Sequence, residues 1–318
     1  MIPAHTARVA SWLAAAAAAL AILSAAGPAP AQAGPAPAQA STPASAAGPP
    51  DIVTAPTLIA STAAGDVGYR QVGTGSPVLL IMGFGGSMDN WAPSFVDALA
   101  TRHTVVVFDN AGIGGTAALP APMSISAMAG QTSALITALH LGRTTVLGWS
   151  MGGMIAQALA ALHPSQVSQL ILAATQAGTG ASLPIPAAAA AALASSDPAT
   201  VLSVLFPPDQ AAAAESYLTG ILQYPGYYGA GAAVKTEQTA AIQQWMAGDD
   251  PAGRQLSRIR ARTLVADGTL DQLDPVPNDR LLARGIPRAL LLLYPDAGHA
   301  FLFQDAAQFV PAIERFVR

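Results

Sequence analysis

The 318-residue sequence contains no cysteine, which excludes disulfide bonds, thiolate-bound metals, a cysteine nucleophile and a lipid-modified N-terminal cysteine. Charge is also scarce: Asp, Glu, Lys and Arg make up 10% of the chain, and the net charge is -4. Without a basic surface the chain cannot hold nucleic acid through phosphate contacts, so no nucleic-acid partner is expected. No group of histidines and carboxylates has metal-ligand spacing, and the sequence predicts no metal.

The N-terminal segment has the pattern of a cleavable export signal. Residues 9–23 form an apolar run of mainly Ala and Leu, and small-x-small cleavage sites end at Ala33 and Ala40. The run is shorter than the roughly 20 residues of a membrane-spanning helix, so a stable membrane anchor is not expected. We therefore predict a signal over 1–40, a Pro- and Ala-rich linker over 41–56, and export to the periplasm or the extracellular space.

Apolar runs alternate with helical patterns from residue 57 onward, which indicates an α/β fold with a mostly parallel sheet and helices on both faces. Eight strands are expected, at 57–61, 67–71, 78–82, 105–108, 145–148, 167–174, 263–266 and 290–294. The turn signal Gly65-Asp66 predicts that the first two pair as a hairpin. Helices are expected around 95–100, 124–139, 151–162 and 301–317.

The alternation stops over residues 176–255, an Ala-rich segment with several prolines. Strand patterns flank the segment, so we expect a helical lid inserted after the sixth strand, between two parts of the core at 57–175 and 256–318. Its large residues are candidates for an apolar pocket, although a lid that packs on its own core would contain the same types: Leu205, Phe206, Tyr217, Tyr227, Tyr228 and Trp245.

The sequence Gly-Trp-Ser-Met-Gly over residues 148–152 lies where a predicted strand ends and a helix begins. This is the G-x-S-x-G pattern of a nucleophile elbow, in which a strained turn exposes the serine and leaves no room for side chains two residues before and after it. A chance turn containing Gly and Ser is the alternative, and the strand and helix on either side argue against it. We predict Ser150 as the nucleophile.

A serine hydroxyl needs a base, and His299 follows the last predicted strand, at the sheet edge where the elbow also lies. The acid that orients the histidine is expected between them in chain order. Asp267, Asp271 and Asp274 all follow the seventh predicted strand. Asp271 is the best candidate because a short turn carries it away from the strand end, whereas Asp267 and Asp274 are interpreted as turn-forming or helix-capping carboxylates.

The Gly-rich segment after the third predicted strand, residues 82–87, allows backbone N–H groups to approach a substrate closely. We expect the N–H groups of Phe84 and Met151 to form the oxyanion hole, and Phe84 and Trp149 to contact the substrate. A phosphate loop is the weaker alternative, because the segment lacks the lysine and the spacing of such loops.

These motifs together resemble the α/β-hydrolase superfamily, and the resemblance covers the chain from about residue 57. It is carried by Gly83-Phe84-Gly85-Gly86, by residues 108–114, by the elbow, by Gly268-Thr269-Leu270-Asp271 and by Gly298-His299. The sequence is similar to the serine-nucleophile branch that contains esterases, cofactor-free haloperoxidases (perhydrolases) and carbon–carbon bond hydrolases. The resemblance implies an eight-stranded sheet, a lid after the sixth strand and no cofactor.

Two positions depart from the family pattern. Met82 stands where members often have histidine, and Ala111 stands where they often have arginine. The expected function is an exported serine hydrolase of small-molecule carboxylic esters with an apolar portion. A perhydrolase or carbon–carbon hydrolase with the same Ser150, His299 and Asp271 is an alternative, as is a binding module of this fold without turnover.

Overall fold

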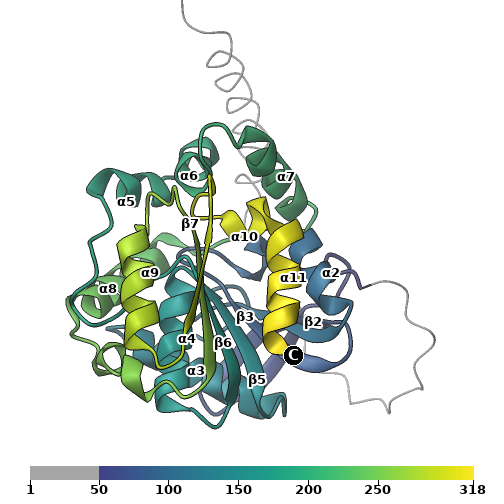
Figure 1. Ribbon diagram of the computed structural model, residues 1–318. Helices are drawn as coiled ribbons and strands as arrows, with labels where there is room; N and C mark the ends of the chain where they lie inside the picture. Colours follow the sequence, from purple (N-terminus) through teal and green to yellow (C-terminus); the bar gives the residue numbers. More distant parts are fainter. Residues whose placement is uncertain (1–49) are drawn as a thin grey trace, which may run out of the picture.

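The computed structural model describes residues 50–318, so the predicted signal and most of the predicted linker lie outside the described residues. Eight strands form one sheet in the order β1-β2-β4-β3-β5-β6-β7-β8 (Figure 1). Their bounds are β1 Leu58–Thr62, β2 Gly65–Val72, β3 Ser76–Ile81, β4 His103–Phe108, β5 Thr144–Trp149, β6 Val167–Ala173, β7 Arg262–Gly268 and β8 Leu290–Tyr294. The expected eight strands and the β1–β2 hairpin are confirmed.

Only the first two pairings, β1 with β2 and β2 with β4, are antiparallel; the other five pairs of neighbours are parallel. The central strands read as continuous Val, Leu and Ile runs because both of their faces are buried. Parallel strands end at one edge of the sheet, so the segments that follow β3, β5, β7 and β8 meet there.

Helices cover both faces of the sheet (Figure 1). The side chains beneath them form two buried layers. The helices α2 (Pro93–Ala100) and α11 (Ala306–Val317) lie on one face. On the other face lie α3 (Ile125–Ala138), α4 (Met151–Leu162) and α9 (Val276–Gly285). The helix expected over 301–317 is divided, because a short α10 (Phe301–Gln304) precedes α11.

Four further helices lie between β6 and β7, within the segment predicted as a lid. They are α5 (Ala187–Leu193), α6 (Pro198–Leu205), α7 (Ala211–Ile221) and α8 (Ala232–Ala247), and two short 3-10 helices follow them at Pro251–Arg254 and Leu256–Arg258. In Figure 1, α5, α6 and α7 lie together above one end of the sheet. None of the helices in residues 50–318 combines the length and the apolar character needed to cross a membrane.

Candidate active site

Ser150 lies at a sharp turn between β5 and α4, with φ 58 and ψ -123, a conformation that costs a non-glycine residue free energy. The flanking glycines make the turn sterically feasible. A Cβ on Gly148 would lie 2.2 Å from Gly152 O, and a Cβ on Gly152 would lie 2.0 Å from Ile81 O. The backbone therefore closes tightly on both sides of Ser150 and holds its side chain at the edge of the sheet.

His299 follows β8, and its ring Nδ1 lies 2.6 Å from Asp271 Oδ2. Asp271 Oδ1 accepts two further bonds, from the backbone N–H of Leu273 at 2.6 Å and of Asp274 at 2.9 Å. The Asp271 side chain is 0% exposed and that of His299 is 3% exposed. Every oxygen of this buried carboxylate thus has a donor, and the contact orients the imidazole with Nε2 free for other chemistry.

The histidine loop is fixed by backbone contacts as well. Trp149 Nε1 donates to His299 O at 3.0 Å, Ala300 N donates to Leu205 O at 2.9 Å, and Leu270 N donates to Ala297 O at 2.8 Å. These bonds join the loop to the elbow, to α6 and to the loop that carries Asp271. The backbone of the loop that carries the imidazole is therefore bonded to three neighbouring segments.

Two backbone N–H groups belong to residues close to Ser150 in the chain or in space. Met151 is the first residue of α4, and Phe84 follows β3. Within residues 50–318 neither N–H has a hydrogen-bond acceptor. A Cβ on Gly83 would lie 3.1 Å from Ser150 Cβ and 3.8 Å from Ser150 Oγ, so this loop directly faces the serine. Free donors beside a serine can stabilise negative charge on an oxygen bound there.

Ser150 and His299 both border a cavity of about 460 Å³. Phe84 and Trp149, predicted to contact the substrate, border it too. Among the described residues no hydrogen bond joins Ser150 Oγ to His299 Nε2. Such bonds are often long in the absence of substrate and tighten on binding. The cavity is the space in which a substrate would meet the serine, the imidazole and the two free N–H groups.

The segment between β6 and β7 supplies much of the cavity wall. Three of its six predicted pocket residues, Leu205, Tyr217 and Tyr227, border the cavity. The other three do not: Phe206 packs against the Tyr217 ring, Tyr228 OH donates to Asp109 Oδ2, and Trp245 is fully buried with its Nε1 donating to Gln176 O. Three of the six large residues thus line the cavity, and the other three pack inside the protein.

The segment between β6 and β7 also holds the Gly-rich loop in place. This is the loop in which Met82 departs from the family pattern. Gln238 Oε1 accepts from Gly85 N at 2.8 Å, and Ala230 N donates to Gly85 O at 2.9 Å. Ser87 Oγ donates to Tyr228 O at 2.6 Å. Burial raises the pKa of Asp109, whose Oδ2 accepts from Tyr228 OH and whose Oδ1 accepts from Met88 N. Asp109 thus serves to hold the loop and is not in the cavity wall.

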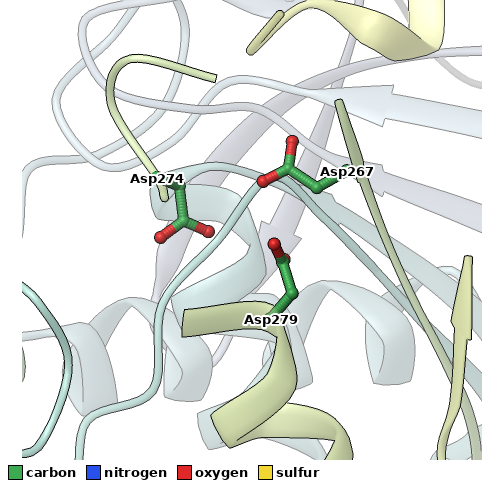
Figure 2. Close-up of side chains that lie close together, drawn as sticks. All are labelled: Asp267, Asp274 and Asp279. Atoms are coloured by element: carbon green, nitrogen blue, oxygen red, sulfur yellow. The ribbon is translucent and has the colours of Figure 1, made fainter. Parts of the chain in front are cut away.

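Three further aspartates lie close together near the end of β7 (Figure 2). Asp267 comes from the end of β7, Asp274 from the following loop and Asp279 from α9, and their side chains point toward one another. All three residues are at most 1% exposed, and one oxygen of each lies within 4.8 Å of the others. We call them the aspartate trio. In residues 50–318, it is the one group with the donors and spacing to hold a metal ion.

The aspartate trio has few hydrogen-bond donors. Gly268 N donates to Asp267 Oδ1 and Asn278 Nδ2 to Asp274 Oδ1, but within residues 50–318 both oxygens of Asp279 and the second oxygens of Asp267 and Asp274 have no donor. Burial, followed by the neighbouring carboxylates, raises the pKa of Asp267 and Asp274 well above the usual range. Burial also raises the pKa of Asp279 to about 8. Shared protons therefore neutralise most of the charge of the trio at neutral pH.

The interpretation of Asp267 and Asp274 as turn-forming or capping residues was wrong. Asp267 is the penultimate residue of β7, and Asp274 bonds the side chain of Asn278 instead of a free N–H at the start of α9. Sequence reasoning also missed Lys235 of α8, which borders the cavity. A compositional signal was present, because Lys235 is the only lysine in the sequence.

Comparison with known proteins places this geometry in a family. Residues 76–306 match the alpha/beta hydrolase fold family. The predicted carbamate hydrolase RutD of Azorhizobium caulinodans is 31% identical over 247 residues, 74% of this chain and 89% of that protein. An alpha/beta hydrolase fold protein from Chitinophaga pinensis superposes with a TM-score of 0.71 at 26% identity, over 84% of this chain and 98% of its own.

A thermophilic esterase from Thermogutta terrifontis is similar as well, with a TM-score of 0.64 and 26% identity over 83% of this chain and 98% of the esterase. The family match covers most of the described residues and includes β3, the elbow, the Asp271 loop and His299. With the eight-stranded sheet and the serine at the turn after β5, the chain belongs to the alpha/beta hydrolase fold family and is a hydrolase.

Proposed function

We propose that the chain is a serine hydrolase of carboxylic esters, with Ser150 as nucleophile, His299 as general base and Asp271 as the carboxylate that orients the histidine. The observation that carries the proposal is the 2.6 Å contact between His299 Nδ1 and Asp271 Oδ2 at the border of the cavity that Ser150 also borders. Orienting an imidazole through Nδ1 leaves Nε2 to accept the proton of a serine hydroxyl.

The chemistry proceeds in two steps of acyl transfer. His299 Nε2 takes the proton of Ser150 as Oγ forms a bond to the ester carbonyl carbon, and the N–H groups of Phe84 and Met151 donate to the oxyanion. The C–O bond to the alcohol then breaks, and the alcohol leaves with the proton from His299. Water attacks the acyl-enzyme by the same route, so that the net reaction consumes one water and releases an acid and an alcohol.

The cavity supports an ester with an apolar portion. Its wall includes Leu202 and Leu205 of α6 and Leu218 and Ile221 of α7. Burial of apolar surface contributes roughly 25 cal/mol per Å², so side chains of this kind favour an alkyl or aryl group over a polar one. The likeness to an esterase supports the same substrate class.

The test combines active-site labelling with turnover. A fluorophosphonate probe is expected to label Ser150, and p-nitrophenyl esters of increasing chain length are expected to be cleaved. Ser150→Ala should abolish both, and the exposed Ser203 gives a matched control, because Ser203→Ala should leave both intact. Absence of labelling and of turnover in the folded protein would contradict the proposal and would favour a binding module.

We further propose that residues 176–255 act as a lid that sets substrate size, since α6 and α7 line the cavity while Ser150, Asp271 and His299 lie outside the segment. Leu202→Phe narrows the cavity and should shift the preference toward shorter acyl chains. Ser203, on the exposed side of α6 and outside the cavity wall, offers the control: Ser203→Phe should leave the chain-length profile unchanged. Equal profiles for wild type and Leu202→Phe would remove the selective role of the segment.

Export is a proposal that rests on the sequence of residues 1–40 alone. The short apolar run and the small-x-small sites predict release of a mature protein that begins at Gly34 or Ser41. Intact-mass measurement of the protein from the periplasm and the medium checks this start. Recovery of the full chain in the membrane fraction would contradict it.

A further inference from the structure

Lys235 is the only lysine of the chain, and it lies in the wall of the cavity that holds Ser150 and His299. It belongs to the first half of α8 and is half-buried. Nothing in the proposed acyl transfer uses it. Moving a charged ammonium group from water toward an apolar wall costs free energy unless an anion or a hydrogen-bond acceptor pairs with it. The position of Lys235 therefore suggests that such a partner binds in the cavity.

The described part of the chain, residues 50–318, provides no such partner. Within residues 50–318 the Lys235 ammonium forms no ion pair and donates no hydrogen bond. Of the described residues, those that border the cavity include no aspartate or glutamate. Asp271, the carboxylate behind His299, has a 0% exposed side chain whose oxygens are already bonded. Among residues 50–318, Lys235 is therefore the one Lys, Arg, Asp or Glu side chain in this wall, in a chain whose net charge is -4.

Contacts between α8 and the Gly-rich loop fix where this charge lies. A Cβ on Gly85 would lie 3.1 Å from Lys235 Cε, so the lysine stem packs directly on the loop backbone. Gln238, three residues later on the same face of α8, accepts from Gly85 N at 2.8 Å. Phe84, which provides one of the two free N–H groups, precedes Gly85. The end of the lysine side chain thus lies beside the loop that carries the Phe84 N–H, in the wall of the cavity that Ser150 also borders.

We infer that Lys235 forms an anion subsite, and that the preferred substrates are esters carrying a carboxylate at a short distance from the scissile carbonyl, such as monoesters of dicarboxylic acids. This rests on the proposed hydrolase function and names its substrate class. The substrate carboxylate pairs with the ammonium, while the methylene groups between the two carbonyl carbons pack on the apolar wall. The bonds that form and break are those of ordinary ester hydrolysis.

The kinetic test uses pairs of probes that differ only in charge. Mono-p-nitrophenyl adipate carries a terminal carboxylate, and its carboxamide analogue has the same size without charge. We expect kcat/KM for the carboxylate probe to exceed that for the carboxamide by about tenfold, mainly through KM, because a charge-assisted contact is stronger than a neutral one. Added salt should reduce the preference.

Variants of Lys235 separate charge from shape. Lys235→Met keeps an unbranched stem and should bring the ratio of the two kcat/KM values close to one, Lys235→Arg should retain most of the preference, and Lys235→Glu should reverse it. Arg102→Met is the matched control, since it removes one positive charge from an exposed position just before β4, at the opposite end of the strands. It should leave the ratio unchanged. Equal ratios in wild type and Lys235→Met would overturn the inference.

A binding measurement keeps the inference testable apart from turnover. Because the sequence has one lysine, modification by an amine-acetylating reagent can be read from a single peptide by mass spectrometry. In Ser150→Ala, adipate should slow acetylation of Lys235 and adipamide should not. Protection by adipate in Ser150→Ala, together with no ester turnover by the wild-type protein, would support the anion subsite and contradict the hydrolase function. Turnover by the wild-type protein without protection and without a preference for the charged probe would support the hydrolase function and contradict the anion subsite.

Discussion

Asp271 and Asp274 lie three residues apart in one loop, yet their carboxylates have opposite surroundings. Asp271 accepts hydrogen bonds from two backbone N–H groups and contacts the His299 ring. Within residues 50–318 Asp274 has one donor, the Asn278 side chain, and it lies close to two other buried carboxylates. The backbone N–H of Asp274 itself donates to Asp271, so one carboxylate is satisfied by the peptide group of the other.

This difference shows that burial alone does not set the chemistry of an acidic residue. Donors stabilise the charged form of a carboxylate, and their absence favours the protonated form. The Asp271 arrangement can stabilise a positive imidazolium next to it, whereas protonation of the aspartate trio reduces the repulsion between its buried carboxylates. We expect substitutions in the two groups to separate activity from stability.

The largest effect is expected from Asp271→Asn. The amide cannot stabilise an imidazolium, and it favours the wrong tautomer of His299, so turnover should fall on the order of 10⁴-fold. Steady-state hydrolysis of a p-nitrophenyl ester gives the rate, and circular dichroism shows whether the variant is folded. The double variant Asp271→Asn with His299→Ala should lose little more than either alone, because the residues act as one unit.

Asp274→Asn is the matched comparison, because it changes the same chemical group in the same loop. The new amide keeps an oxygen for Asn278 and adds a donor for its neighbours, so most of the turnover should remain. If folded Asp271→Asn kept near-normal turnover and Asp274→Asn lost it, the orienting acid would be Asp274.

The aspartate trio should give the protein a characteristic dependence of stability on pH. The pKa values of Asp267, Asp274 and Asp279 are raised in the folded chain, so the native state binds protons that the unfolded chain has released. Their contribution is complete below about pH 4 and is lost as pH rises through the folded pKa values, to about 8 for Asp279. The free energy of unfolding should fall by up to about 1.4 kcal/mol per pH unit for each proton released.

Urea denaturation between pH 5 and 9 measures this slope. Asp279→Asn should flatten it, because an amide needs no proton to stay neutral, and the exposed Asp209 offers a control whose substitution by Asn should not change it. A wild-type protein that becomes more stable toward pH 9 when calcium is added, and loses that gain with EDTA, would contradict this account. A cation would then neutralise the trio instead of protons.

The fold could be predicted because its signals are local. Central strands buried on both faces are apolar along their whole length, and β3, β4 and β5 show this directly. The elbow has a sequence signal because Gly148 and Gly152 are required by contacts within the turn and with the neighbouring strand. The spacing of Asp271 from the end of β7 reflects the short turn that brings it to the histidine loop.

The aspartate trio and Lys235 could not be predicted in the same way, because the contacts that define them are tertiary. A strand end, a loop and a helix each contribute one carboxylate to the trio, and no short motif spans them. Asp279 lies in a helix that the sequence analysis did not distinguish. The position of Lys235 in the cavity wall depends on the packing of α8 against the Gly-rich loop, which the sequence of α8 alone does not reveal.

The smallest expected effect extends the comparison from carboxylates to two neighbouring tryptophans. Trp149 and Trp91 are both buried, with ring centroids 6.4 Å apart. Trp149 Nε1 donates to His299 O at 3.0 Å, whereas Trp91 Nε1 has no acceptor within residues 50–318. Trp149→Phe therefore removes a hydrogen bond, whereas Trp91→Phe removes an N–H group that has no acceptor within residues 50–318.

Trp149→Phe should lower kcat/KM by a few-fold and at most about tenfold, because a neutral hydrogen bond contributes about 0.5–1.5 kcal/mol and its loss leaves His299 O unpaired. The phenyl ring retains part of the contact with His299, whose ring centroid lies 5.6 Å from that of Trp149. Trp91→Phe loses packing but also removes an unsatisfied N–H, so the free energy of unfolding should fall by less than the packing loss alone, while kcat/KM should remain within about twofold. Steady-state kinetics and urea denaturation give kcat/KM and the free energy of unfolding for each of the two variants. An equal fall in kcat/KM for the two variants would show that ring volume, and not the hydrogen bond, positions the histidine loop.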